Sequence, residues 1–225
     1  MRIAVIGTGK TGGKVIELLK DEAVAFNRNN QVTPVKLKQC DAAVVFVPGD
    51  AAASVLKPVL ESGIPAVWGT TGFKWPENLN ELIREKNTQW IIGSNFSMGM
   101  NLIRKAILLL SKDAEILDNP QFHIHEIHHT HKKDAPSGTA ISWSEWLGKD
   151  AEISSERRGD IKGIHSLEIR TKFERITLRH VALDRALFAE GAIWSARFLL
   201  SDNNLKPGLY SFSEIFDMAE KVVSL

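Results

Sequence analysis

Residues 2–12 read RIAVIGTGKTG, so that a short apolar run leads directly into a glycine-rich turn. The aliphatic run is typical of a strand buried within a parallel sheet. The turn contains a complete G-x-G-x-x-G pattern and opens a helix predicted over residues 10–20. This strand, turn and helix together predict a dinucleotide-binding fold, in which backbone amides and the helix N-terminus hold a pyrophosphate. The alternative is a glycine-rich turn that binds no ligand.

Apolar runs and helical patterns alternate through the first half of the chain. The continuous apolar run at 42–47 is typical of a strand covered on both faces. The helix predicted after it contains Pro58, which we expect to kink or split that helix. Strand–helix alternation of this kind predicts an α/β protein with a Rossmann-type, doubly wound parallel sheet.

The pattern changes near residue 97. A long helix is predicted over 98–114, an alternating strand over 121–131, and two long strands over 161–171 and 173–183. We therefore expect an inserted α+β domain at 97–183 that serves substrate binding and oligomerisation. Residues 1–96 and 184–225 would form the dinucleotide-binding domain.

The composition excludes several classes of protein. The 225 residues are 44% hydrophobic and 24% charged, and the formal net charge of +1 lacks the basic excess of a broad nucleic-acid surface. Cys40 is the only cysteine, which rules out an intrachain disulfide and a thiolate zinc cluster. The most apolar stretch, 103–110, is too short to span a bilayer. We expect a cytoplasmic protein with no membrane or nucleic-acid partner.

Asn27 and Arg28 follow the second predicted strand, where a dinucleotide fold usually places an acid against the adenosine ribose. No acid stands there. Asn27 can still hydrogen-bond a ribose, and Arg28 can form a charge-assisted fork with a 2′-phosphate. The pair favours NADPH as cofactor, with NADH also possible. The alternative is that Arg28 is a solvated loop cation.

Five of the seven histidines fall within residues 122–133. On a strand, Glu126 and His128 would share one face, and His123, His125, His129 and His131 the other. A zinc site is one interpretation, and we expect none because no flanking carboxylate or thiol has a zinc-site spacing. A polar strand at a sheet surface is another. The third is an active site, because histidine transfers protons near neutral pH.

The residues that follow favour the active site. Ser137 and Thr139 place hydroxyls at a predicted helix start, where free amides favour an anion. Gly138 allows close backbone approach, and Lys132 adds a positive charge. Together they predict a carboxylate pocket beside titratable histidines.

Residues 126–140, EIHHTHKKDAPSGTA, resemble the E-x-H-H-x-x-K-x-D-x-P-S-G-T-A signature of the dihydrodipicolinate reductase family. Further similar segments are collinear along nearly the whole chain: the N-terminal glycine pattern, GTTGF at 69–73, NFSMGMN at 95–101, and Arg185 with FAEGA at 188–192. The chain departs from the family pattern between Lys149 and Arg158, where it is shorter. It also has Gly163-Ile164-His165 where Gly-Glu-His is usual.

The resemblance implies a role for each matching residue. His128 would be the catalytic acid/base and Lys132 a second proton donor or electrostatic stabiliser. Substrate carboxylates would be held by His129, Ser137, Gly138 and Thr139. Cofactor would be bound by Gly7, Thr8, Gly9, Lys10, Thr11 and Gly12 at the pyrophosphate, by Asn27 and Arg28 at the ribose, and by Gly69, Thr70, Thr71, Gly93, Ser94, Asn95 and Phe96 at the nicotinamide half.

The implied activity is NAD(P)H-dependent reduction of a cyclic imine dicarboxylate, giving tetrahydrodipicolinate in lysine and diaminopimelate biosynthesis. The hydroxylated and dehydrated forms of the imine both remain open as substrate. The resemblance also implies a homotetramer. Two alternatives are a related reductase or amino-acid dehydrogenase acting on another small imino or keto acid, and a non-catalytic NADP-sensing protein.

Overall fold

The structure is a computed structural model that describes residues 1–201 and 204–223. It divides into two compact units, one formed by Met1–Ser97 with Arg185–Leu225 and the other by Met98–Asp184. The chain enters the second unit at the start of a long helix and leaves it after the last strand of a small sheet. Each unit has its own sheet and its own apolar core.

The first unit is built on a parallel sheet of six strands in the order β10-β5-β4-β3-β1-β2. β1 lies between β2 and β3, so the strand order reverses there, as in a doubly wound sheet. The strands are β1 (Ile3–Ile6), β2 (Ala23–Phe26), β3 (Ala42–Val45), β4 (Ala66–Trp68), β5 (Gln89–Ile92) and β10 (Gly208–Ser211).

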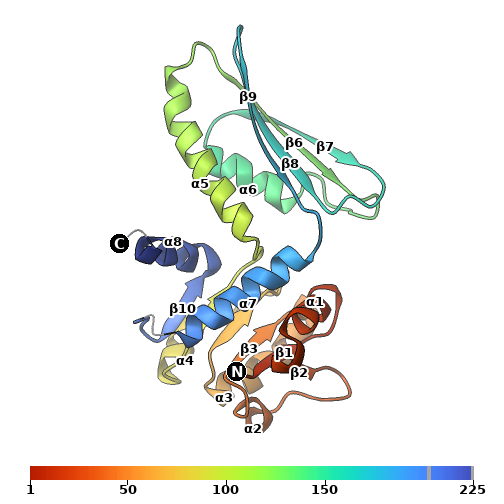
Figure 1. Ribbon diagram of the computed structural model, residues 1–225, viewed down its shortest axis with the longest axis vertical. Helices are drawn as coiled ribbons and strands as arrows, with labels where there is room; N and C mark the ends of the chain where they lie inside the picture. The colour runs from red at the N-terminus through yellow and green to blue at the C-terminus, as the bar shows by residue number, and fades with distance from the viewer. Residues whose placement is uncertain (202–203, 224–225) are drawn as a thin grey trace. The chain divides into compact units, whose positions relative to one another are not determined.

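Helices cover both faces of this sheet (Figure 1). Its helices are α1 (Lys10–Leu19), α2 (Pro34–Leu37), α3 (Gly49–Ser62), α4 (Leu79–Glu85), α7 (Ala186–Leu200) and α8 (Phe212–Val223), with a 3₁₀ turn at Lys20–Glu22. α1 and α7 pack side by side, and α7 also lies against β3 and β4. α7 approaches closely because its buried residues are mostly small, as at Ala189, Ala192 and Ala196. On the other face, apolar residues of α2, α3 and α4 complete the core with Trp68 and Trp90.

α3 does not split at Pro58, contrary to the sequence prediction, and its helix runs unbroken from Gly49 to Ser62. Proline removes the hydrogen bond to the carbonyl four residues earlier, which belongs to Ser54. Ser54 is exposed, so water can satisfy that carbonyl. Val55 and Val59 are buried and hold the two halves of the helix against the core.

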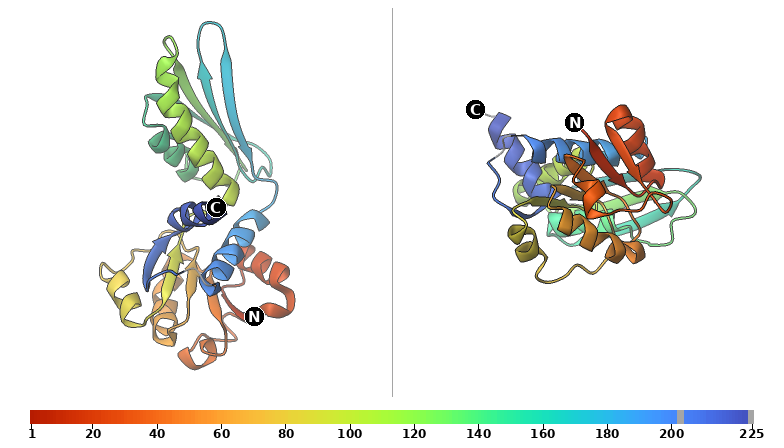
Figure 2. Two further views of the ribbon diagram at one scale, coloured as in Figure 1. Left: turned by 60° about the vertical axis from the view of Figure 1, so that its left-hand side comes forward. Right: turned by 90° about the horizontal axis from the view of Figure 1, so that it is seen from below.

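The second unit has a mixed sheet of four strands in the order β7-β6-β8-β9. Its elements are α5 (Met98–Asp113), a 3₁₀ turn (Ala114–Ile116), β6 (Gln121–His128), α6 (Gly138–Leu147), β7 (Ala151–Arg157), β8 (Ile164–Arg170) and β9 (Arg175–Val181). β6 and β7 are parallel, whereas β8 is antiparallel to β6 and to β9. α5 and α6 pack together on one face of this sheet, α5 against β9 and α6 against β6 (Figure 2).

Three elements were not predicted from the sequence, namely α2, β7 and β10. The strand predicted over 121–131 also ends earlier, at His128. His129 and His131 therefore lie in the following loop rather than on the sheet face that carries His123 and His125. Among the described residues, no helix is long and apolar enough to cross a membrane.

Candidate active site

The predicted cofactor residues lie along one edge of the parallel sheet. Every segment named for cofactor binding begins directly after a strand, and these strand ends are in register: Ile6 beside Phe26 and Val45, Val45 beside Trp68, and Trp68 beside Ile92. The segments that open at Gly7, Asn27, Gly69 and Gly93 therefore leave the sheet at the same edge. Ligands of open α/β sheets bind outside the carboxyl ends of the strands, which is this edge.

The glycines of the first turn differ in what surrounds them. Gly7 has a φ of +93°, and a Cβ there would lie 2.3 Å from the carbonyl oxygen of Phe46. A Cβ on Gly12 would lie 1.8 Å from the carbonyl oxygen of Gly7. Both positions therefore require glycine for packing. Gly9 has no atom within 4 Å of its Cβ position, so the space above the start of α1 is open.

Two further observations fit a bound dinucleotide. No side chain caps the N-terminus of α1, and its first turn contains no acid, so its amides remain available for an anion. Among the described residues, the buried hydroxyl of Thr70 has no hydrogen-bond partner. A buried hydroxyl without a partner is costly, and a ligand at this sheet edge would remove that cost.

The remaining cofactor candidates differ in exposure. Asn27 and Arg28 are exposed, and the Asn27 side-chain oxygen accepts hydrogen bonds from the amides of Asn29 and Asn30 at 2.9 and 3.1 Å. This leaves the side-chain amide of Asn27 as a donor. Phe96, by contrast, is 1% exposed and its ring packs against Phe212, so only its backbone can face a ligand.

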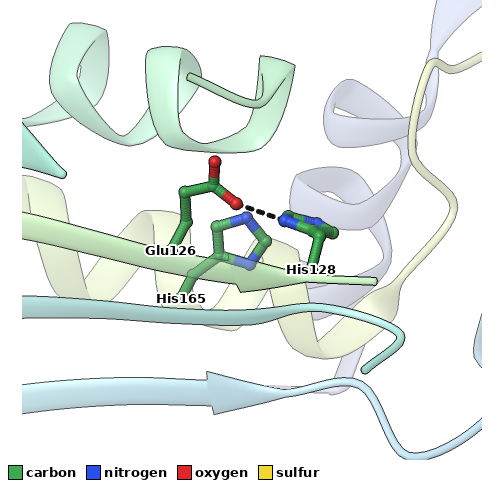
Figure 3. A group of neighbouring side chains, drawn as sticks. All are labelled: Glu126, His128 and His165. Atoms are coloured by element: carbon green, nitrogen blue, oxygen red, sulfur yellow. Dashed lines mark hydrogen bonds and ion pairs between the residues drawn. The ribbon is translucent and has the colours of Figure 1, made fainter. Parts of the chain in front are cut away.

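At the end of β6, a carboxylate and an imidazole, those of Glu126 and His128, lie in the core of the second unit. Glu126 is 0% and His128 8% exposed, and both point to the sheet face that α6 covers. His128 Nδ1 is hydrogen-bonded to Glu126 Oε2. His165 of β8 lies opposite Glu126, and its ring meets that of His128 edge to face at 5.0 Å between centroids (Figure 3).

Arg157 of β7 joins this cluster to the loop after β6. Its Nη2 donates to Glu126 Oε1 at 2.9 Å, and its Nε donates to the carbonyl of Lys132 at 3.2 Å. Lys132 Nζ in turn donates to both oxygens of Asp134 at 2.8 Å. Lys132 is thus held beside the end of β6, where its charge can act on an anionic ligand.

α6 begins at this cluster. Ser137 caps the helix, because its Oγ accepts from the Ala140 amide at 3.2 Å, and its own amide donates to Glu126 Oε1 at 3.3 Å. The same Oγ is 3.2 Å from His165 Nε2. Gly138 and Thr139 follow as the first two residues of the helix, whose amides have no acceptor within it.

The surroundings shift the pKa values of the buried groups. Burial lowers the pKa of His128, its contact with Glu126 raises it, and the net result is below the ordinary value. Burial opposes ionisation of Glu126, but hydrogen bonds from Arg157, Ser155 and His128 outweigh it and hold the Glu126 pKa below its usual range. Burial and the neighbouring His128 lower the pKa of His165 to about 3, so His165 is neutral at physiological pH.

Sequence reasoning placed Glu126 and His128 on one face but assigned no role to Glu126, Arg157 or His165. Glu126 had a signal, its spacing of two residues from His128 on a strand. Arg157 lay in a stretch read as a connection, and His165 is brought in only by strand register.

Comparison with known proteins shows which family this chain resembles. The family model described as "Dihydrodipicolinate reductase, C-terminus" matches residues 99–216. A 4-hydroxy-tetrahydrodipicolinate reductase of Thermosipho africanus is 33% identical over 234 residues, which cover 97% of this chain and 99% of the relative.

This chain belongs to the dihydrodipicolinate reductase family.

Another family member is the 4-hydroxy-tetrahydrodipicolinate reductase of Bdellovibrio bacteriovorus, 34% identical over 187 residues that cover 80% of this chain and 78% of the relative. The dipicolinate-bound dihydrodipicolinate reductase of Paenisporosarcina sp. TG-14 has the same fold, with a TM-score of 0.76 and 19% identity over 96% of this chain and 99% of that one. The predicted family and the predicted Rossmann-type α/β fold are both confirmed.

Proposed function

We propose that this chain catalyses the NAD(P)H-dependent reduction of 4-hydroxy-tetrahydrodipicolinate to tetrahydrodipicolinate in lysine and diaminopimelate biosynthesis. The observation that carries the proposal is the buried His128–Glu126 pair beside Lys132 and the first turn of α6, in a chain of this family. The reaction adds a hydride and a proton and releases one water from the hydroxylated substrate. A cytoplasmic location is part of the same proposal.

The first unit would bind the cofactor and the second unit the substrate. A reduced nicotinamide supplies the hydride when the cofactor is bound. Gly7 to Gly12 would hold the pyrophosphate with the amides of the α1 start. The segments 69–71 and 93–96 would line the nicotinamide half, and the hydroxyl of Thr70 would gain its missing partner there.

In the second unit, His128 would deliver the proton and Lys132 would stabilise the negative charge that develops on the ring. His129 and the amides of Gly138 and Thr139 would hold the carboxylates. The Ser137 hydroxyl already bonds the Ala140 amide and His165, so Ser137 would act mainly by fixing the start of α6. A direct contact between Ser137 and the substrate stays a prediction.

We also propose that NADPH is preferred to NADH. Arg28 is exposed on the loop after β2. A second cation, Lys36 of α2, reaches the same loop, where its Nζ donates to Asn30 Oδ1 at 2.9 Å. A charge-assisted bond to a 2′-phosphate contributes about 1.5–3 kcal/mol, which corresponds to roughly tenfold or greater discrimination.

The dissociation constants of NADPH and NADH, measured for the unmodified protein and for Arg28→Ala, test this preference. The substitution should weaken the binding of NADPH and leave the binding of NADH nearly unchanged. Lys20→Ala, which removes an exposed cation from the end of α1, serves as the charge-matched control. Much tighter NADH binding by the unmodified protein would rule out the assignment of Arg28.

Turnover tests the activity itself. The chain should oxidise reduced nicotinamide when given freshly made product of dihydrodipicolinate synthase, and it should be inactive with α-keto acids and ammonia. Turnover of an amino or keto acid instead would indicate an amino-acid dehydrogenase. Tight cofactor binding without turnover of any of these compounds would indicate a sensor.

A further inference from the structure

The covered face of the β7-β6-β8-β9 sheet changes from apolar to polar along its length. Ile153, Ile124, Leu167 and Leu178 form one row across the four strands. The next row toward the end of β6 is Ser155, Glu126, His165 and His180. Glu126 is 0% exposed within this row, so an ionised carboxylate lies inside the core of the unit.

A carboxylate in this position is unfavourable unless each oxygen has a partner. Oε1 accepts from Arg157 Nη2 at 2.9 Å and from the Ser137 amide at 3.3 Å. Oε2 contacts His128 Nδ1, and the Ser155 side chain also hydrogen-bonds the carboxylate. The carboxylate is therefore fixed in orientation by partners on both of its oxygens.

We propose that Glu126 is a positioning residue for His128, which fixes the ring with Nδ1–H toward the carboxylate and leaves Nε2 as the atom that transfers the proton, and that Arg157 tunes this pair. The proposal deepens the reductase function above and rests on it. Gly163 supports the assignment of Nε2, because a Cβ at that glycine would lie 3.1 Å from this nitrogen. Glycine thus keeps the space beside Nε2 clear.

The charged and titratable groups facing His128 come from β6, β7 and β8 and from the loop after β6. Glu126 raises the His128 pKa, whereas Lys132 and Arg157 lower it, together with burial. Lys132 is itself paired with Asp134. His165 is neutral near pH 7, and His180 faces His165 rather than His128.

These contacts predict opposite effects for two substitutions. Glu126→Gln keeps the shape of the side chain but removes the charge that favours imidazolium, so the His128 pKa should fall. An opposite charge within about 4–6 Å typically shifts a pKa by about 1–3 units, and we expect a shift of about one unit or more. Arg157→Gln removes a repelling charge, so the His128 pKa should rise.

Nuclear magnetic resonance of the full chain, with histidine labelled in ¹⁵N and ¹³C, measures both the tautomer and the pKa without substrate. His128 is assigned from the signal lost in His128→Gln. In the unmodified protein, neutral His128 should carry its proton on Nδ1. Glu156→Gln is the matched control, because Glu156 adjoins Arg157 on β7 but contacts His125, with His125 Nε2 at 3.8 Å from Glu156 Oε2.

Activity gives the second readout. Glu126→Gln should lower kcat by about 10- to 100-fold, less than the loss of a general acid, and shift the alkaline limb of the pH profile, where His128 loses its proton, to lower pH. KM and the cofactor dissociation constant should change by less than about twofold, because the group transferring the proton is still present. Glu156→Gln should leave kcat unchanged.

Neutral His128 with its proton on Nε2 would overturn the proposal, and the tautomer is read from the unmodified protein once the His128 signal is assigned. So would a His128 pKa that does not fall in Glu126→Gln or does not rise in Arg157→Gln. If the unmodified protein does not reduce the imine, the proposed function fails, while the titration still decides the role of Glu126.

Discussion

His128 and Lys132 lie four residues apart, on opposite sides of the point where β6 ends. If His128 donates the proton and Lys132 stabilises developing charge, removing either should lower kcat by about 10²–10⁴-fold. The losses in His128→Ala and Lys132→Ala should be less than additive in the double variant, because both groups serve one transition state. Steady-state kinetics measures them, and cofactor titration should give an unchanged dissociation constant.

The control for these variants is His131→Ala, which removes an exposed imidazole from the same loop. It should retain near-normal turnover. Circular dichroism establishes that each variant is folded. If a folded His128→Ala protein reduces the imine at the normal rate, His128 takes no part in catalysis and the polar cluster at the end of β6 has only a structural role.

His165 makes the second unit sensitive to acid. Its pKa is lowered to about 3 by burial and by the nearby His128, whereas an unfolded histidine titrates near 6.5. Between these two values the unfolded chain binds the extra proton, so the free energy of unfolding should fall as the pH drops from about 6.5 toward 3. The slope from one such group is at most about 1.4 kcal/mol per pH unit.

Urea unfolding between pH 7 and 4 measures this dependence. His165→Gln can keep the hydrogen bond to Ser137 but cannot titrate, so its stability should depend less on pH. His131→Gln, an exposed histidine outside the row, should retain the full dependence. Equal slopes for His165→Gln and the unmodified protein would show that His165 is not kept neutral by burial.

Glu126, His128 and His165 also raise the question of a metal, because their ligand atoms all lie within 4.8 Å of one another. Each already has a partner in the chain, and a cation there would face Arg157, whose Nη2 is 2.9 Å from Glu126. We therefore predict that activity needs no metal. Elemental analysis of protein purified without a histidine tag, with turnover before and after chelation, tests this. A stoichiometric metal whose removal abolishes turnover would contradict it.

At the level of elements, the glycines of the β1–α1 turn differ in their surroundings: two are needed for packing, and one faces open space. Gly9→Ala adds a methyl group where no atom lies within 4 Å, so stability should be kept while cofactor affinity falls. Gly7→Ala should lower both stability and cofactor affinity, because φ is +93° and the added Cβ would lie 2.3 Å from the Phe46 carbonyl oxygen. Thermal unfolding and cofactor titration distinguish the two.

Gly13→Ala is the control for this turn. Its Cβ would lie 3.8 Å from the Thr8 carbonyl, an ordinary contact, and alanine should stabilise the helix by about 0.5–1 kcal/mol. Cofactor affinity should stay the same. Unchanged affinity in Gly9→Ala as well would indicate that the turn holds no pyrophosphate.

For the whole molecule, the sheet of the second unit suggests self-association. In the part of the chain that the structure describes, β7 and β9 are the outer strands, and each is seven residues long. Free strand edges are ready to pair with another chain. We propose a homo-oligomer, with the tetramer implied by the family as its expected form. Light scattering coupled to size exclusion measures the mass, and replacing Thr177 of β9 with proline should reduce it. A monomeric unmodified protein would contradict this.

The sequence by itself determined much of the first unit. Five short apolar strands, the glycine turn and the amphipathic helices between them depend on local patterns, so their order predicts a parallel sheet. The strand ends then fall in register, and the cofactor candidates share one edge without further information. The spacing of Glu126 and His128 likewise placed both on one face of β6, because side chains alternate along a strand.

Only the tertiary structure decided how the cluster around His128 is completed. The residues of β7 and β10 are partly polar, so these segments become strands through pairing with β6 and β5 rather than through their own patterns. Pairing brings Arg157 beside His128 and His165 beside Glu126, across 29 and 39 residues of chain. A charged carboxylate in a core is stable only with such partners. The local sequence around Glu126 does not predict which residues these partners are.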